Sequence, residues 1–169
     1  MLKAQAGNRQ ALGQVLDRCQ PPLLRHIARF VGQDHAVKDV WQETVVAAMK
    51  GLRSLTDPAL FRPWLYRIAT FKCRDWQRGR YRERASLHEL REVQFTESEP
   101  QRSAEEQSVL QTLQKLDGEQ RQILALFYRE GLTIHELAVA LDIKPGAAKT
   151  RLFRARKEFR KHWEGEHHE

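Results

Sequence analysis

The sequence predicts an all-α protein made of two small helical domains joined by a linker. Apolar residues recur at three- and four-residue steps along most of the chain, which is the spacing of a buried helix face. Residues 86–103 contain a proline, several serines and only scattered apolar residues, as linkers do. The length of 169 residues suffices for two small domains. We place the first domain at 5–85 and the second at 104–163.

Basic residues outnumber acidic ones, and the excess lies in the first half. The chain has 29 Lys and Arg against 22 Asp and Glu, a formal net charge of +7. Residues 1–85 hold 16 basic and 7 acidic residues (net +9), residues 86–103 hold 2 and 4 (net −2), and residues 104–169 hold 11 of each. Such a balance favours a polyanionic partner, with nucleic acid ahead of a membrane surface.

Several classes of protein do not fit this sequence. No apolar run approaches the roughly 20 residues that span a bilayer, and the first residues lack the layout of a signal peptide, so we expect a cytoplasmic protein without membrane insertion. Cys19 and Cys73 lack the close pairing of zinc ligands and are interpreted as packing residues. Because no nucleophile with its base and no phosphate-binding loop is found, we expect no enzymatic activity, cofactor or metal.

In the first domain, a helix is predicted from Asp34, a suitable N-cap. Its apolar face comprises Val37, Val40, Trp41, Thr44, Val45 and Ala48. Asp39, Gln42 and Glu43 share a different face, because they are spaced at i, i+3 and i+4. This face could dock a basic partner, although spacing alone favours a solvated helix surface.

A second long helix is predicted to begin near Pro58 or Pro63, because proline is tolerated in a first turn. Its apolar face comprises Phe61, Trp64, Leu65, Ile68, Ala69, the stem of Lys72, Cys73 and Trp76. The other faces are basic, and the aromatic residues Tyr66, Phe71 and Tyr81 lie among the basic ones. Basic side chains bind phosphates and aromatic rings stack on bases, so this helix suits single-stranded or distorted DNA. Composition supports equally the alternative that these aromatic residues are all core and the arginines only aid solubility.

The second domain is predicted to begin with two amphipathic helices. The first covers 104–116, and its inward residues are Val109, Leu110, Leu113 and Leu116. The second is capped by Asp117 and ends at Gly131, and its buried residues are Ile123, Leu124 and Phe127.

A helix-turn-helix is predicted to follow. Thr133 and Glu136 form a capping box that opens a short helix, whose buried residues are Ile134, Leu137, Ala138 and Leu141. A tight turn leads to a basic helix from Pro145, whose inward row is Ala148, Leu152, Ala155, Phe159 and Trp163.

The basic helix is predicted to enter a DNA groove by its N-terminal turns. Gly146 allows that end to approach closely, and Lys149, Thr150 and Arg151 are placed for base edges and nearby phosphates. The residues further along that are expected to contact phosphates or solvent are Arg154, Lys157 and Arg160. The alternative is a solvated basic helix, which the capped helix before it makes the weaker interpretation.

Three segments carry a resemblance to a known family: "KDVWQETVVAAMK", "FRPWLYRIATFKCRDW" and "EGLTIHELAVALDIKPGAAKTRLFRARKEF". In order and spacing they resemble the extracytoplasmic-function group of sigma-70-type bacterial transcription initiation factors. The resemblance runs from "GNRQAL" to about Phe159 and excludes the linker and the tail.

The resemblance implies a sigma factor without catalytic chemistry, with region 2 at about 5–85 and region 4 at about 104–163. Its implied partners are core RNA polymerase and promoter DNA, and we add the hypothesis of an anti-sigma factor. The residues implied to dock on the clamp helices of the largest polymerase subunit are Asp39, Gln42 and Glu43. Those implied to bind and open the -10 element are Trp64, Arg67, Phe71, Lys72, Arg74, Trp76 and Arg78. Those implied to read the -35 element, in a region that packs near the polymerase flap, are Pro145, Gly146, Lys149, Thr150, Arg151, Arg154 and Lys157.

Some positions depart from the family pattern. Phe71 stands where an asparagine is common, Lys144 replaces the usual Ser or Thr before the recognition helix, and Ala147 and Ala148 stand where Thr-Val is common. Lys144 therefore leaves the basic helix without a good side-chain N-cap.

Two rival interpretations remain open. A helix-turn-helix regulator that never meets polymerase would explain the second domain alone. An enzyme would need a metal site in the tail, where histidines and glutamates cluster after residue 161. A flexible end of this kind usually reflects solvation or weak adventitious binding.

Overall fold

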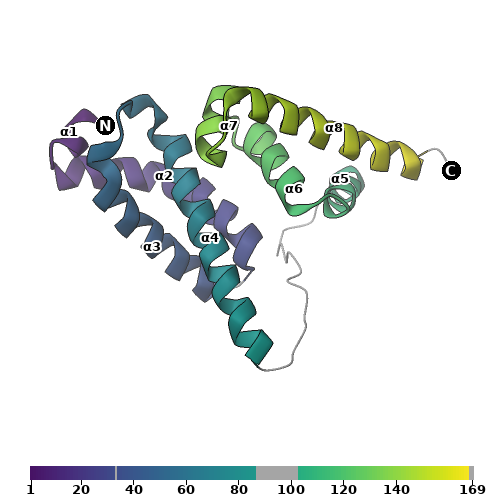
Figure 1. Cartoon of the computed structure of the whole chain (residues 1–169), viewed down its shortest axis with the longest axis horizontal. Coiled ribbons are helices and arrows are strands. Elements are labelled where there is room, and N and C mark those ends of the chain that lie inside the picture. The colour runs from purple at the N-terminus through teal and green to yellow at the C-terminus, as the bar shows by residue number, and fades with distance from the viewer. Residues whose placement is uncertain (33, 87–102, 168–169) are drawn as a thin grey trace. The chain divides into compact units, whose positions relative to one another are not determined.

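The computed structural model describes residues 1–32, 34–86 and 103–167. These residues form helices joined by short turns, and among them there is no strand. The chain divides into two compact helical units, Met1–Glu97 and Ser98–Glu169 (Figure 1). The predicted all-α class with two small helical domains is confirmed. The predicted linker falls almost wholly on residues 87–102, outside the described part.

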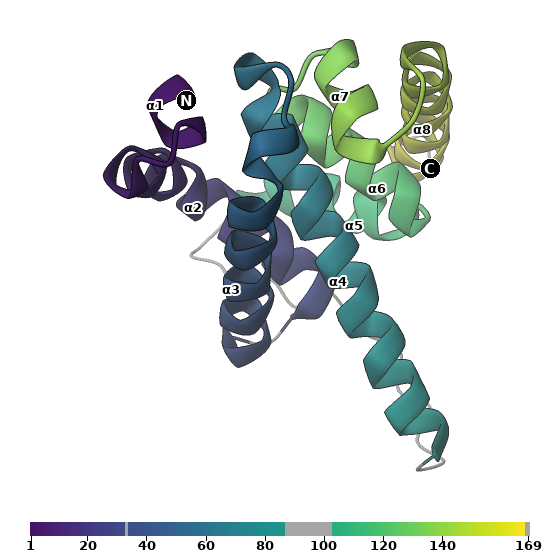
Figure 2. The same cartoon turned by 60° about the vertical axis from the view of Figure 1, so that its left-hand side comes forward.

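The first unit is built on three long helices that all contact one another (Figure 2). They are α2 (Arg9–Val31), α3 (Asp34–Gly51) and α4 (Phe61–Ser86). The short α1 (Leu2–Gln5) lies on α2, and the 3-10 turns η1 (Leu52–Ser54) and η2 (Pro58–Leu60) connect α3 to α4. Asp34 is itself the first residue of α3 rather than its N-cap, a difference of one position.

A polar pair, His26 and Thr70, is enclosed in the core of the first unit. His26 on α2 is almost fully buried, and its Nε2 lies 3.0 Å from Oγ1 of Thr70 on α4. The rings of Phe30 and Tyr66 pack on the imidazole, with centroids at 5.1 and 5.0 Å. Burial, with a smaller contribution from the nearby Arg29 charge, lowers the pKa of His26 to about 3. The imidazole is therefore neutral at pH 7, as a buried group with a hydrogen-bond partner should be.

The predicted apolar faces of α3 and α4 point inward, with gradation. On α3, Val40, Thr44 and Ala48 are buried, whereas Val37, Trp41 and Val45 are half-buried at the flanks of the face. On α4, the buried residues are Phe61, Leu65, Ala69 and Cys73, and the half-buried ones are Trp64, Ile68, Lys72 and Trp76.

The second unit is arranged around α8 (Pro145–His167), which contacts α5 (Ala104–Gln114), α6 (Gly118–Leu124) and α7 (Ile134–Leu141). Capping boxes open α5, α6 and α7, and they begin at Ser103, Asp117 and Thr133. Two of these caps, at Asp117 and Thr133, are those expected from the sequence, although Gln120 completes the box with Asp117. Among the described helices, none has the length and apolar content to cross a bilayer.

One expected core position of the second unit, Val109, is wrong, and another, Phe127, is only partly enclosed. Phe127 is only half-buried, while Leu126 beside it is completely buried. Leu126 follows the buried Ile123 by three residues and shares its face, whereas Phe127 lies at the edge of that face, in a π-helical stretch, Ala125–Arg129. Val109 on α5 is exposed, and Thr112 occupies the interior instead, with its hydroxyl donating to the Ser108 carbonyl at 3.0 Å.

Candidate polymerase and nucleic-acid interfaces

The outward face of α3 combines polar and apolar side chains. Asp39, Gln42 and Glu43 are all exposed on it, as their spacing predicts. One turn further along, Val46 and Met49 are 50% and 51% exposed on the same side of the helix, because they follow Gln42 at i+4 and i+7. Sequence reasoning missed these two residues, although their spacing from Gln42 could have revealed them. The face therefore offers apolar area beside acidic groups, as surfaces that dock other proteins do.

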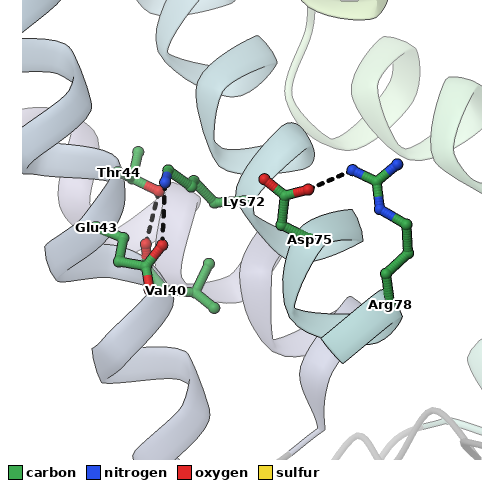
Figure 3. Close-up of polar contacts among 6 residues, drawn as sticks. All are labelled: Val40, Glu43, Thr44, Lys72, Asp75 and Arg78. Atoms are coloured by element: carbon green, nitrogen blue, oxygen red, sulfur yellow. Dashed lines mark hydrogen bonds and ion pairs between the residues drawn. The ribbon is translucent and has the colours of Figure 1, made fainter. Parts of the chain in front are cut away.

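This face is connected to α4 by an ion pair. Oε2 of Glu43 lies 3.1 Å from Nζ of Lys72, and Figure 3 shows the two side chains meeting between the helices. On the inner side of α3, the Thr44 hydroxyl donates to the Val40 carbonyl at 2.7 Å, which satisfies its buried oxygen. The structure thus joins a residue expected to dock polymerase and one expected to bind DNA.

The aromatic residues of α4 divide between the core and the surface. Tyr66 is 1% exposed and belongs to the core, whereas Phe71 and Tyr81 project outward, Phe71 with 58% of its surface exposed. The alternative that all of these aromatic residues are core is therefore contradicted for Phe71 and Tyr81 and confirmed for Tyr66. The exposed rings are available for stacking on unpaired bases, for which any nucleobase offers a face.

Basic side chains surround these rings. Arg67, Arg74 and Arg78 are exposed on α4, and Arg78 also pairs with Asp75 one turn before it (Figure 3). The guanidinium of Arg80 lies over the half-buried Trp76 ring at 5.3 Å from its centroid. Trp64 packs at the start of the helix, where its Cζ2 would lie 3.1 Å from a side-chain carbon at Gly51. The contact explains why a residue without a side chain ends α3.

On the second unit, the outer face of α8 is exposed. Its inner face is closed, because Ala148, Leu152 and Ala155 are buried. The outward residues that sequence reasoning assigned to DNA are all exposed: Pro145, Gly146, Lys149, Thr150, Arg151, Arg154 and Lys157. The Thr150 hydroxyl donates to the Gly146 carbonyl at 3.0 Å, so its hydrogen is already engaged and its oxygen remains an acceptor.

Phe153 lies in the middle of this basic face and is 68% exposed. It follows Lys149 by four residues and precedes Lys157 by four, so the three side chains form a row. The inward periodicity of α8 skips position 153, which was the available signal that this ring faces outward. A large exposed ring among cations suits contact with the methyl groups of thymine in a major groove.

Two side chains of α8 reach α6 and the π-helical stretch that follows it. Arg151 Nη1 lies 3.5 Å from Oε2 of Glu119 on α6. Arg156 lies over two rings of the π-helical stretch, 4.8 Å from the centroid of Phe127 and 5.3 Å from that of Tyr128. These contacts link the DNA-facing helix to the elements before α7.

Family models match both units. A model described as sigma-70 region 2 matches residues 15–83, and one described as sigma-70 region 4 matches residues 106–159. The RNA polymerase sigma-H factor of Pseudomonas aeruginosa is 30% identical over 167 residues, which cover 91% of this chain and 86% of that protein. The chain belongs to the sigma-70 family of RNA polymerase sigma factors. Relatives named as ECF factors place this sigma factor in the extracytoplasmic-function group, as the resemblance predicted.

Other similarities agree with this membership. A protein of Xanthomonas campestris pv. campestris, named "Probable RNA polymerase sigma factor RfaY", is 33% identical over 163 residues. The match covers 90% of this chain but 40% of that protein. The sigma factor RpoE from Bartonella quintana, solved in complex with the anti-sigma factor NepR, has the same fold at a TM-score of 0.73. Its identity is 21%, over 90% of this chain and 96% of that one.

Sigma factors are non-enzymatic initiation factors, and burial favours the protonated form of both thiols of this one. Burial raises the pKa of the Cys73 thiol to about 12, and burial likewise raises the pKa of Cys19, so neither is a thiolate at pH 7. Within the described residues there is no group of three or more side chains able to hold a metal ion. The end of the tail, His168 and Glu169, lies outside those residues.

Proposed function

We propose that this sigma factor binds core RNA polymerase through α3, binds and opens the -10 element with α4, and reads the -35 element with α8. The observation that carries the proposal is the pairing of each family segment with an exposed face of fitting chemistry. Region 2 holds an acidic and apolar face next to a basic and aromatic one, and region 4 holds the basic face of α8. Two DNA-binding faces of different character suit a duplex element and an opened one.

The proposed polymerase surface consists of Asp39, Gln42, Glu43, Val46 and Met49. Its carboxylates would meet basic groups of the clamp helices, and its two apolar side chains would lose water on docking. The proposed -10 surface consists of Trp64, Arg67, Phe71, Lys72, Arg74, Trp76, Arg78 and Tyr81. Phe71 is 58% exposed and has no amide, so stacking rather than amide hydrogen bonding is the contact expected at this position.

The proposed -35 surface consists of Pro145, Gly146, Lys149, Thr150, Arg151, Phe153, Arg154 and Lys157. Residues in the first turns of α8 would reach base edges, and those further along would contact phosphates. The proposal places the protein in the cytoplasm, with core polymerase and promoter DNA as its partners. The complex of the Bartonella quintana relative with NepR supports an anti-sigma factor as a further partner of this chain.

Reconstitution with core polymerase tests the proposal. The wild-type chain is compared with Asp39→Ala/Glu43→Ala, and with Gln14→Ala/Asp17→Ala as a control that truncates two exposed polar residues of α2. We expect tight binding to core for the wild type and the control, and weak binding for the first variant. Transcripts initiated from genomic DNA should share two spaced upstream elements. A chain that does not bind core polymerase but binds duplex DNA by itself would instead be a helix-turn-helix regulator.

A further inference from the structure

The ion pair between Glu119 and Arg151 links α6 to the DNA-facing helix. Its atoms, Oε2 and Nη1, lie 3.5 Å apart, and both side chains are about half exposed or more. The place of Glu119 is well defined, since the capping box of Asp117 and Gln120 fixes the first turn of α6, with bonds of 2.7 and 3.3 Å. Glu119 therefore approaches Arg151 from a fixed turn of a neighbouring helix.

Fixing an arginine matters most where it reads a base. A free arginine side chain samples many rotamers, and part of this entropy is lost when the guanidinium binds. A carboxylate that holds one edge of the guanidinium restricts it before DNA arrives. The pair engages Nη1, and the other N–H groups of the planar fork stay available for two parallel hydrogen bonds. The base that presents two acceptors in the major groove for such a fork is guanine, through O6 and N7.

We propose that Glu119 is a positioning residue that holds Arg151 to read one guanine of the -35 element. The inference rests on the proposed function, because it requires that α8 enters the major groove. It adds a residue outside the helix-turn-helix to the determinants of promoter specificity. Arg151 occupies the second turn of α8, within the part of a recognition helix that reaches base edges.

Fold stability does not account for the ion pair between Glu119 and Arg151. Exposed ion pairs contribute little to stability, so its loss should leave the fold intact. A negative charge next to DNA also repels phosphates, which weakens binding to every sequence alike. Removing Glu119 should therefore relax base preference at one position while raising affinity for unrelated DNA slightly. A residue that acted by charge alone would change affinity and leave the preference unchanged.

Selection of DNA by the holoenzyme separates these effects. Core polymerase loaded with the full chain selects from a duplex pool that is randomised across the upstream element, and the bound fraction is sequenced. The chains compared are the wild type, Glu119→Gln, Arg151→Gln and the double variant. The matched control is Glu158→Gln, which removes the same charge from α8 itself, seven residues after Arg151 on the same side of the helix.

We expect the wild type to prefer guanine at one position, and Glu119→Gln to reduce that preference about tenfold, near the value of a lost bidentate contact. Arg151→Gln should reduce it at the same position, and the double variant should lose no more than Arg151→Gln alone. Glu158→Gln should keep the wild-type profile. A Glu119→Gln profile identical to the wild type, or relaxation in both glutamate variants alike, would overturn the inference and leave the proposed function standing. Absence of any base preference in the wild-type holoenzyme would instead overturn the proposed function.

Discussion

Glu43 on α3 and Lys72 on α4 are joined by an ion pair of 3.1 Å, with the lysine side chain the more buried of the two (Figure 3). The proposed polymerase surface and the proposed -10 surface therefore share one contact. While the pair is intact, the ammonium of Lys72 is neutralised by a carboxylate rather than by a phosphate. A basic group of polymerase that engages Glu43 would release Lys72 for DNA, so we expect docking and DNA binding to favour one another.

The first prediction concerns the free chain. Glu43→Gln should raise its affinity for a single-stranded oligonucleotide about two- to fivefold at low salt, because partly exposed ion pairs are worth about 0.5–1 kcal/mol. It should also steepen the salt dependence by about 0.7 in the logarithmic slope, since one more phosphate is neutralised. Fluorescence anisotropy at several salt concentrations measures both quantities.

Asp39→Asn is the matched control for this experiment, because it removes the same charge from the same exposed helix face. It should raise affinity less than Glu43→Gln does. In a Lys72→Gln background the Glu43→Gln change should lose its advantage over the control. Equal gains from Asp39→Asn and Glu43→Gln would mean that net charge, not the ion pair, limits DNA binding.

The second prediction compares the effects of truncating two neighbouring residues on α8, the exposed Phe153 and the buried Leu152. Phe153→Ala should change the free energy of unfolding by no more than about 0.5 kcal/mol, because the ring is exposed. It should weaken holoenzyme binding to a promoter duplex about tenfold, a loss similar to that of a mismatched base pair. Leu152→Ala should instead cost about 2–5 kcal/mol, since Leu152 is buried. Urea unfolding and duplex binding distinguish the two, and a Phe153→Ala chain that binds every duplex like the wild type would remove this ring from the -35 surface.

The helices and their caps could be predicted from local sequence, and the exact inward residues could not always be. Thr133 and Asp117 act as caps because their side chains accept backbone N–H groups only a few residues away. Leu126 rather than Phe127 is completely buried, because periodicity from Ile123 allows either residue, at i+3 or i+4, and cannot choose between them. Local spacing also cannot reveal pairs such as Glu119 with Arg151, which are 32 positions apart.

Some features of the candidate surfaces were likewise predictable from the sequence, and others were not. The exposure of Asp39, Gln42 and Glu43 was predictable, because a helix with one apolar face exposes the opposite residues. Which aromatic residues of α4 are buried was not predictable, because Tyr66 and Phe71 have neighbours of similar composition. Tyr66 is drawn inside by its contact with His26, a residue 40 positions earlier. Only the packing of α2 on α4 brings these rings together.

The third prediction concerns acid stability of the first unit. The pKa of His26 is about 3 in the folded chain and near 6.5 when unfolded, so between these values the unfolded state binds the extra proton. Stability contributed through His26 is therefore complete above about pH 6.5 and is lost as the pH falls toward 3, by about 1.4 kcal/mol per unit. Urea unfolding between pH 7 and pH 4.5 measures this slope.

The comparison chain for this prediction is His26→Leu/Thr70→Val, which removes the titrating ring together with the hydroxyl that would lose its partner. Its stability relative to the wild type should improve steadily as the pH falls below 6.5. A difference that stays constant across this range would show that other groups cause the acid sensitivity.

The last prediction concerns the start of α8. Lys144 stands there in place of the usual Ser or Thr, so the helix lacks a side-chain N-cap. The Ala148 N–H donates to the Lys144 carbonyl at 3.0 Å, which places Lys144 at the N-cap. A lysine side chain has no acceptor, so it cannot bind the exposed N–H groups of the first turn. Lys144→Ser should therefore stabilise the second unit by about 1 kcal/mol, seen as a higher urea midpoint. Pro145 favours the extended backbone that a cap residue adopts at position 144, so the serine should fit without rearrangement.

Lys144→Gln separates capping from charge, because it removes the same positive charge without placing a short oxygen acceptor at the cap. It should leave the midpoint near that of the wild type, whereas Thr133→Ala, which deletes the cap of α7, should lower it by a similar amount to the gain from serine. Equal stabilisation by Gln and Ser would show that the lysine charge, repelled by the N-terminus of α8, was the cause. Because position 144 directly precedes the DNA-facing turns, a gain in stability together with weaker duplex binding would mean that Lys144 also contacts a phosphate.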